Sequence, residues 1–479
     1  MMKKTFFLAV ILCCYLQSYG NIVDSTRTLT AKEKFKNFFS LRDTDTIREF
    51  NQITTYESYK EQAHPKNNKR WGVAFGGYIS QDNIFDTRQS ITAREGIITL
   101  YPANIKTDKN GKDINARPSF NMLAMNTRLT GRITAPKALG ADISGMLEGW
   151  FVGVANSDAN GFCLRHAIIQ LQWPTTHLLI GQTWHPLFTE NCFAYTLTGS
   201  AGAPFQAFSR APQIRVKQNF GINNLMLYIS AQRDYASIGF NGTSSEYLRN
   251  SAIPEGGMQY FLDFKKHNKK DSSLTSNTLI GIGGDYKYLI PRVVTSDNEY
   301  CHKGVHSWAV IAFLHHQHAL THHSQLGLKV KGMYSQGVND FLLVGGYAVR
   351  YYDSYALNSA VNFDYVGLNN VSVWFDLYTN IKSWEVAIFG GYTQNLGAFK
   401  NIQDWNNANS YFTKDYDIRS IQRISARVKY TAKQLQFAFE PEYTTVLYGQ
   451  QRNSLGEVQR EGAKLVGNLR LLLTAILYF

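Results

Sequence analysis

Basic side chains at alternate positions are the first feature of this sequence that could do chemistry. Within residues 418–430, arginine and lysine recur on one parity, and the other parity is mostly apolar. Because successive side chains of a β-strand point to opposite faces, the basic groups share one face, which must be wet. Two other stretches repeat the pattern. The predicted basic face comprises Arg128, Arg132, Arg215, Lys217, Arg419, Arg423 and Arg427.

Two roles are open to such a face. An ion in a narrow, low-dielectric constriction interacts more strongly than in bulk water, so unpaired arginines would guide anions through a pore. The alternative is a ladder of buried cross-strand charges that stiffens the wall, because Asp376, Glu440 and Glu442 also fall on inward parity. We predict that the basic groups line a pore and bind solutes.

A long connection from Trp184 to Ala211 is the predicted constriction. Its glycines and prolines suit a loop, and Phe205 and Phe208 would give an inward-folded segment something to bury. Arg210 would then join the solute-binding set. An ordered loop outside the pore is the alternative interpretation.

Histidines cluster at positions 315, 316, 318, 322 and 323, which resembles a metal-binding tract. They lie across a predicted tight turn with no cysteine or carboxylate close in sequence, so we interpret them as a solvated rim. Opportunistic metal binding is the alternative. No nucleophile elbow, P-loop, HExxH or dinucleotide motif occurs, so we predict no catalytic residues, no metal and no cofactor.

The elements that must position these side chains are long strands with alternating character. About sixteen candidate strands follow Trp71, and the gaps between them alternate between short turns and long loops. That layout is typical of an outer-membrane barrel. We therefore predict an all-β fold, a transmembrane antiparallel β-barrel over residues 71–479. Residues 91–101 and 341–351 are assigned to structured parts of long loops, and Phe479, which follows the alternating stretch 463–478, is the predicted assembly signal.

The N-terminus and the composition agree with an exported chain. Residues 1–20 combine two lysines, a short apolar core and a small-x-small site, which predicts a signal peptide. Residues 21–70 are highly charged with helix-like spacing, so a small N-terminal periplasmic helical segment is expected. The net charge of +13 then indicates an anionic surface or an anion-selective interior, not nucleic acid. Aromatic residues make up 14% of the chain, as two interface girdles require.

Several motifs resemble one family. Residues 162–173 (Phe-Cys-Leu-Arg-His-Ala-Ile-Ile-Gln-Leu-Gln-Trp) and 181–184 (Gly-Gln-Thr-Trp), with 127–131 (Thr-Arg-Leu-Thr-Gly), resemble the early strands of DcaP-like trimeric porins. The resemblance implies a sixteen-stranded homotrimer that passes small hydrophilic solutes, with a leaning to anionic ones such as dicarboxylates. Because the third loops of porins commonly fold into the barrel, the resemblance is also what implies an inward fold for the connection from Trp184 to Ala211. Arg165 shares parity with an apolar face, so we expect it at the rim or in the trimer interface.

The expected function is passive diffusion of small polar or anionic solutes through the outer membrane of a Gram-negative cell. Expected partners are outer-membrane lipid, the outer-membrane assembly machinery and two further copies of the chain. Adhesion or ligand binding through long surface loops is one alternative. A barrel enzyme and a soluble secreted sandwich are the others.

Overall fold

Most of the region after Arg70 is described by the computed structural model. The described residues are 71–197, 199–268, 274–294, 298, 300–301, 303–321, 323–351, 363–414 and 416–479. The predicted signal peptide and the predicted helical segment of residues 21–70 lie outside them. Among the described residues, no helix is both long and apolar enough to cross a bilayer.

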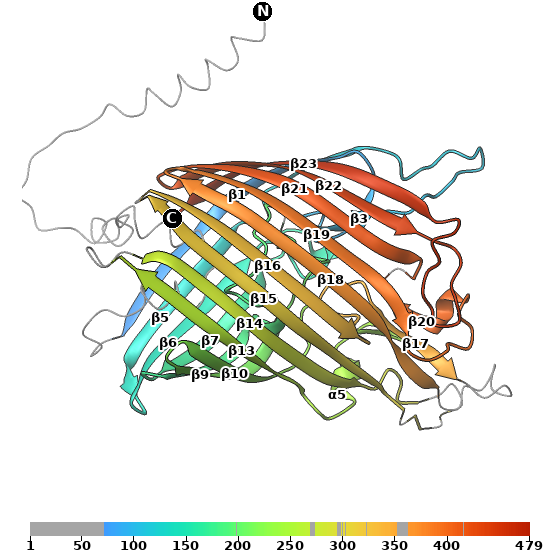
Figure 1. Cartoon of the computed structure of the whole chain (residues 1–479), viewed down its shortest axis with the longest axis horizontal. Helices are drawn as coiled ribbons and strands as arrows, with labels where there is room; N and C mark the ends of the chain where they lie inside the picture. The colour runs from blue at the N-terminus through green and yellow to red at the C-terminus, as the bar shows by residue number, and fades with distance from the viewer. Residues whose placement is uncertain are drawn as a thin grey trace, which may run out of the picture. The chain divides into compact units, whose positions relative to one another are not determined.

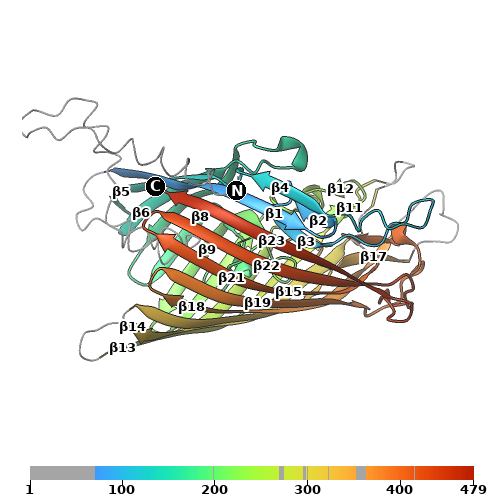
Figure 2. The ribbon, with the colours of Figure 1, turned by 90° about the horizontal axis from the view of Figure 1, so that it is seen from above.

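Sixteen long strands form a closed antiparallel barrel, as the sequence predicts (Figure 1). Each strand pairs with the next in order, and the last pairs with the first. Figure 2 shows this closure, with β1 in blue beside β23 in red. The strands are β1 (Gly72–Asp86), β5 (Arg128–Ala138), β6 (Ala141–Trp150), β7 (Cys163–Gln172), β8 (Thr176–Trp184), β9 (Arg210–Phe220), β10 (Asn223–Ser230), β13 (Glu255–His267), β14 (Leu274–Leu289), β15 (Val305–Thr321), β16 (Ser324–Gln336), β18 (Asp364–Ile381), β19 (Trp384–Ala398), β21 (Ile418–Ala432), β22 (Leu435–Tyr448) and β23 (Lys464–Tyr478).

Connections are sorted by length between the two ends of the barrel. One end, which we call the turn rim, carries turns such as 139–140, 221–222, 382–383 and 433–434. At the first of these, Leu139 and Gly140 both have positive φ (55° and 72°), as a two-residue hairpin turn that matches strand twist requires. The other end, the loop rim, carries long connections such as 185–209, 231–254 and 337–363.

The strand faces follow the predicted parity. In β21, Arg423, Arg427 and Lys429 are buried, while Ile424 and Val428 are exposed on the outer surface. In β23, likewise, Asn468 and Arg470 are buried and the alternating leucines face outward. A wall that is apolar outside and polar inside is what a bilayer requires of a barrel.

Some strands differ in detail from the prediction. The expected strand 120–133 is two pieces, β4 (Ser119–Leu123) and β5, which pair with successive parts of β1. The 91–101 stretch forms a hairpin of β2 (Ser90–Ala93) and β3 (Ile98–Pro102). Near the loop rim lie β11 (Ile238–Gly239), β12 (Gly242–Thr243), α5 (Glu246–Arg249), β17 (Gly346–Tyr351) and β20 (Tyr411–Thr413).

The largest apolar cluster lies inside the barrel. Phe188, Phe205, Phe208 and Phe341 come from long connections, and they pack with wall residues such as Trp374. Each buried aromatic side chain of this kind contributes about 1.5–3 kcal/mol relative to exposure. Long connections are therefore folded inward and held there by packing.

Candidate functional site

The connection 185–209 lies within the barrel, as predicted for a constriction. It begins with the 3-10 turn η2 (Pro186–Phe188), and nearly all of its described side chains are buried. Lys331 of β16 donates from Nζ to the carbonyl oxygens of Leu187 and Phe188. The Tyr195 amide donates to the Asp376 carboxylate at 3.4 Å. We call this segment the inner loop.

The β2–β3 hairpin also enters the barrel, which the sequence analysis did not predict. Residues 97–102 are all buried, and β3 contacts β22 and β23. Arg423 joins both inward segments to the wall. Its guanidinium donates to the carbonyl oxygens of Leu100 (2.7 Å) and Ala203 (2.9 Å).

Between the inner loop and the wall strands β1, β5, β6 and β23 lies a cavity of about 110 Å³, which we call the arginine chamber. Arg128, Arg132 and Arg165 line it together with one carboxylate, Glu148. Arg165 is ion-paired with that carboxylate, and Arg128 Nε lies 3.5 Å from it. Among the described residues that line the chamber, three carry a guanidinium group and one carries a carboxylate, so basic side chains predominate in the lining.

Aromatic rings hold the guanidinium groups in place. The Arg165 guanidinium lies 5.2 Å from the Trp150 ring and 5.1 Å from the Trp184 ring. Arg210 stacks on the same two rings at 4.6 and 5.1 Å, and it is ion-paired with Asp234 at 2.7 Å. Cation–π contacts of this kind are stronger when desolvated. Arg210 is therefore a fixed neighbour of the chamber.

A second cavity of about 50 Å³ lies farther along the wall, against β9, β10, β13, β14 and β15, and we call it the smaller chamber. The predicted residues Arg215 and Lys217 line it, with Glu190 and Gln259. Arg215 is ion-paired with Glu190 of the inner loop at 2.8 Å. The two chambers therefore flank the inner loop, and each brings together two of the predicted basic residues.

Arg165 corrects the sequence analysis. A β-bulge interrupts the β6–β7 pairing here, because Glu148 pairs with His166 and Gly149 pairs with Leu164. The extra residue turns Arg165 inward, where it is 3% exposed, whereas strict alternation placed it on the outer face. This position gives no support to its predicted role in a trimer interface.

Two other predicted residues have structural partners. Arg427 is ion-paired with Asp376 (3.3 Å) and Glu385 (3.0 Å). Arg419 lies at a bulge near the loop rim and is ion-paired with Glu457. It is therefore separate from the other basic residues that face the barrel interior, which differs from its predicted place in the pore. The cross-strand ladder therefore describes part of the predicted set, and other members of the set line the two cavities.

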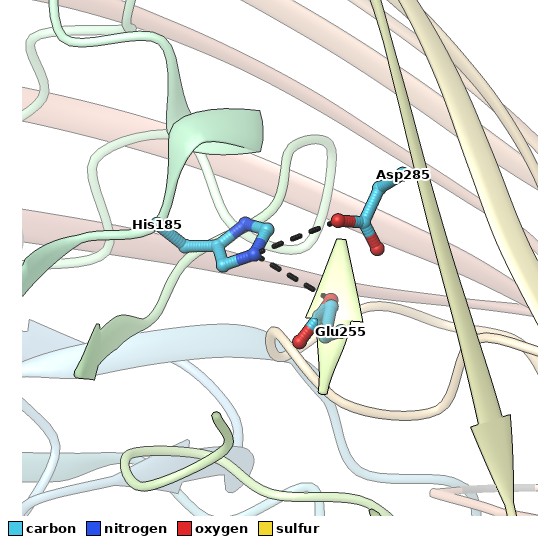
Figure 3. A group of neighbouring side chains, drawn as sticks. All are labelled: His185, Glu255 and Asp285. Atoms are coloured by element: carbon cyan, nitrogen blue, oxygen red, sulfur yellow. Dashed lines mark ion pairs between the residues drawn. The ribbon is translucent and has the colours of Figure 1, made fainter. Parts of the chain in front are cut away.

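A buried ionic cluster was missed by sequence reasoning (Figure 3). His185 Nε2 points toward Glu255 Oε1 at 3.5 Å and Asp285 Oδ2 at 3.8 Å. Lys287 Nζ donates to Glu255 at 2.9 Å and to Asp340 at 2.7 Å. We call these five residues the buried clamp. They are spread over 156 positions from 185 to 340, so no local spacing could have revealed them.

His185, Glu255 and Asp285 could together present ligands to a metal ion, but two features of the clamp favour a hydrogen-bonded cluster. The His185 Nδ1 accepts the Leu187 amide hydrogen at 3.3 Å, so the neutral ring carries its proton on Nε2, the atom that a metal would need. The Lys287 ammonium already supplies a cation. Burial lowers the pKa of His185 to about 4, which keeps the ring neutral at pH 7.

The histidine tract has a partly different role from the predicted solvated rim. His318 is exposed. His315, however, is half-buried, and its ring nitrogens bond to the Asn191 carbonyl at 2.9 Å and the Tyr378 hydroxyl at 3.0 Å. This residue helps to hold the inner loop. His322 lies outside the described residues.

No protein-family model and no curated protein match the chain. Among solved structures, the outer-membrane channel DcaP of Acinetobacter baumannii has a TM-score of 0.58 at 13% identity, covering 87% of this chain and 100% of that one. The anion-selective porin from Comamonas acidovorans gives 0.48 at 11% identity, with coverage of 86% and 100%. OmpT of Vibrio cholerae gives 0.46 at 9%, with 87% and 100%.

The similarity to DcaP agrees with the resemblance that the sequence motifs indicate. At 13% identity it concerns the fold. The chain therefore has the fold of a sixteen-stranded porin barrel, as predicted.

Proposed function

We propose that this chain is an outer-membrane porin through which small hydrophilic solutes diffuse passively, with anions favoured. The observation that carries the proposal is the arginine chamber, a cationic cavity enclosed between an inward-folded loop and the wall of a transmembrane barrel. In this interpretation the turn rim faces the periplasm and the loop rim faces outside.

Electrostatics support the preference for anions. A unit charge 4 Å from an anion contributes about 4 kcal/mol at an effective dielectric constant near 20, before desolvation is counted. The predominantly basic lining of the arginine chamber would therefore favour anions over cations. Small dicarboxylates fit this charge, and we propose them as one solute class.

The inward path of the long connections favours a channel over an adhesin or an enzyme. Three of them, in whole or in part, turn into the barrel: the β2–β3 hairpin, the inner loop and residues 338–344. An adhesin would instead present such segments to the outside. The buried acidic and basic groups described above are engaged in holding loops to the wall, so we also infer that the chain is not an enzyme.

Location and assembly are part of the same proposal. The outer wall is apolar, as contact with outer-membrane lipid requires. We propose a homotrimer in the outer membrane of a Gram-negative cell. We further propose that the assembly machinery inserts the barrel and reads Phe479.

Planar-bilayer recordings with purified full-length protein test the function. We expect discrete channels whose reversal potential in a salt gradient shows anion preference. The double substitution Arg128→Gln with Arg132→Gln should lower the anion-to-cation permeability ratio by about tenfold, which corresponds to about 1.4 kcal/mol. Glu148 keeps Arg165 as its partner in this variant, so the wall should remain folded.

Lys464→Gln is the matched control, because Lys464 is an exposed basic residue at the loop-rim end of β23. It should leave the ratio unchanged. No channel activity from correctly folded protein would contradict the porin proposal. Channels with equal selectivity in the double variant and the wild type would contradict the role of the chamber.

A further inference from the structure

Residues 338–344 join β16 to β17 and are buried inside the barrel. Every side chain from Val338 to Val344 is at most 5% exposed. The Phe208 amide of the inner loop donates to the Phe341 carbonyl at 3.0 Å, and the Phe341 amide donates to the Tyr235 carbonyl at 3.2 Å. We call residues 338–344 the second inner segment. It packs directly on the constriction, although it comes from a different connection.

The backbone of this segment is held in an unfavourable conformation. Phe341 and Leu342 both have φ of 61°, a left-handed conformation that bulky residues rarely adopt. Two such residues in succession persist only where the surroundings hold them. The strain therefore favours departure of the segment from its buried position.

The buried clamp acts in the opposite direction. Asp340 Oδ2 accepts hydrogen bonds from Lys287 Nζ at 2.7 Å and from Gln232 Nε2 at 2.9 Å. The same ammonium lies 4.1 Å from the Phe341 ring, and the His185 ring lies 4.7 Å from it. Lys287 of β14 thus holds the second inner segment in two ways, because its ammonium group pairs with Asp340 and also lies over the ring of Phe341.

Glycines bracket the segment and provide hinges. Gly337 precedes it with φ of 73°, and Gly345 and Gly346 follow with φ of 154° and 145°. A Cβ at Gly337 would lie 2.8 Å from the His306 carbonyl oxygen, and one at Gly346 would lie 2.2 Å from that of Phe412. Only glycine fits these positions, and its backbone freedom allows a rigid segment to swing.

We propose that residues 338–344 are a plug that closes the channel and leaves as a unit when the contact between Asp340 and Lys287 breaks. The inference rests on the proposed porin function and adds a gate to it. Backbone strain favours the released position and the clamp favours the seated one. Opposed contributions of this kind give a two-state element.

The test removes one charge of the clamp at nearly constant size. Asp340→Asn leaves Lys287 paired with Glu255, so the wall retains its buried ion pair. In planar bilayers we expect the variant to spend at least threefold more time in its largest conducting state than the wild type. Migration in heat-modifiable form on a gel checks that the barrel is folded.

Thiol labelling reports the position of the plug independently of current. Cys163, Cys192 and Cys301 are replaced by serine, and Leu343→Cys is introduced with and without Asp340→Asn. A maleimide that does not cross membranes should modify this thiol several times faster in the Asp340→Asn background. Met333→Cys is the matched control, because Met333 is 3% exposed on β16, just before the plug, and should stay protected in both backgrounds.

The outcomes separate the two proposals. Faster labelling at position 343 with longer opening supports the plug. Labelling at 343 that stays as slow as at 333 in both backgrounds would overturn it, whether or not conductance changes. Faster labelling at 343 without any channel activity would support a mobile segment and contradict the porin function on which the gate depends.

Discussion

Arginines on the inner wall divide into groups that face a cavity and groups that tether a loop. Arg128 and Arg132 line the arginine chamber. Arg423 instead donates to carbonyl oxygens of two inward segments and is ion-paired with Glu442 at 3.2 Å. The same residue type on the same predicted face therefore has two different roles, which the sequence pattern cannot separate.

Arg423→Gln should loosen the interior without reversing selectivity. The substitution leaves the Glu442 carboxylate buried without its ion pair, which costs about 3–5 kcal/mol. It also frees the backbone of residues 100 and 203 from the wall. We expect noisier and larger currents, and we expect the compact form on a gel to be lost at a lower temperature. Arg460→Gln is the control, because it removes the same charge from an exposed residue.

Strict alternation predicted most inward residues correctly, and β-bulges explain the two exceptions. Arg165 lies where Glu148 and Gly149 break register, and Arg419 lies between Ile418 and Ser420, where β21 slips against β22. One extra residue reverses the face of a side chain. A bulge depends on pairing with a neighbouring strand, so a single strand's sequence does not contain it.

At the scale of elements, the strands were predictable and the inward path of most loops was not. Apolar alternation and the contrast between short and long gaps predicted about sixteen strands, and the barrel has sixteen. The inner loop was predicted to fold inward by resemblance to the third loops of porins, and its glycine, proline and phenylalanine residues agreed with that. The β2–β3 hairpin and the plug carry no such signal, since their partners are carbonyl groups and charges on distant strands.

Closure of the barrel places Phe479 against β1. The Gly77 amide donates to the Phe479 carbonyl at 3.0 Å, and the Phe479 amide donates to the Gly77 carbonyl at 3.1 Å. Deleting Phe479 removes both hydrogen bonds at the turn rim. We expect the assembled fraction in cells to fall severalfold, while the molecules that do assemble conduct as the wild type does.

Phe479→Ala separates the two contributions, because it keeps both main-chain hydrogen bonds and removes the half-exposed ring. If the ring is the signal that assembly reads, this variant should fall in yield like the deletion. Normal yield and normal conductance from both variants would contradict the role of Phe479.

At the scale of the whole molecule, direct contacts join the barrel wall to the segments that fold into its interior. Arg423, Lys331 and Lys287 each join a strand to segments that enter from the loop rim. Most described side chains of the inner loop, and all of those between 97 and 102, are buried. The barrel is therefore stabilised from inside as well as by its strand pairing.

The inward path of these connections also decides what the cell presents to its surroundings. With the loop rim facing outside, as proposed above, a protease or an antibody that approaches the barrel meets little of the inner loop or of residues 338–344, because both are enclosed by the wall. What it meets instead are rim segments such as residues 106–112, whose side chains are exposed. Sequence changes in these rim segments would then alter what such a molecule recognises and leave the interior of the barrel unchanged.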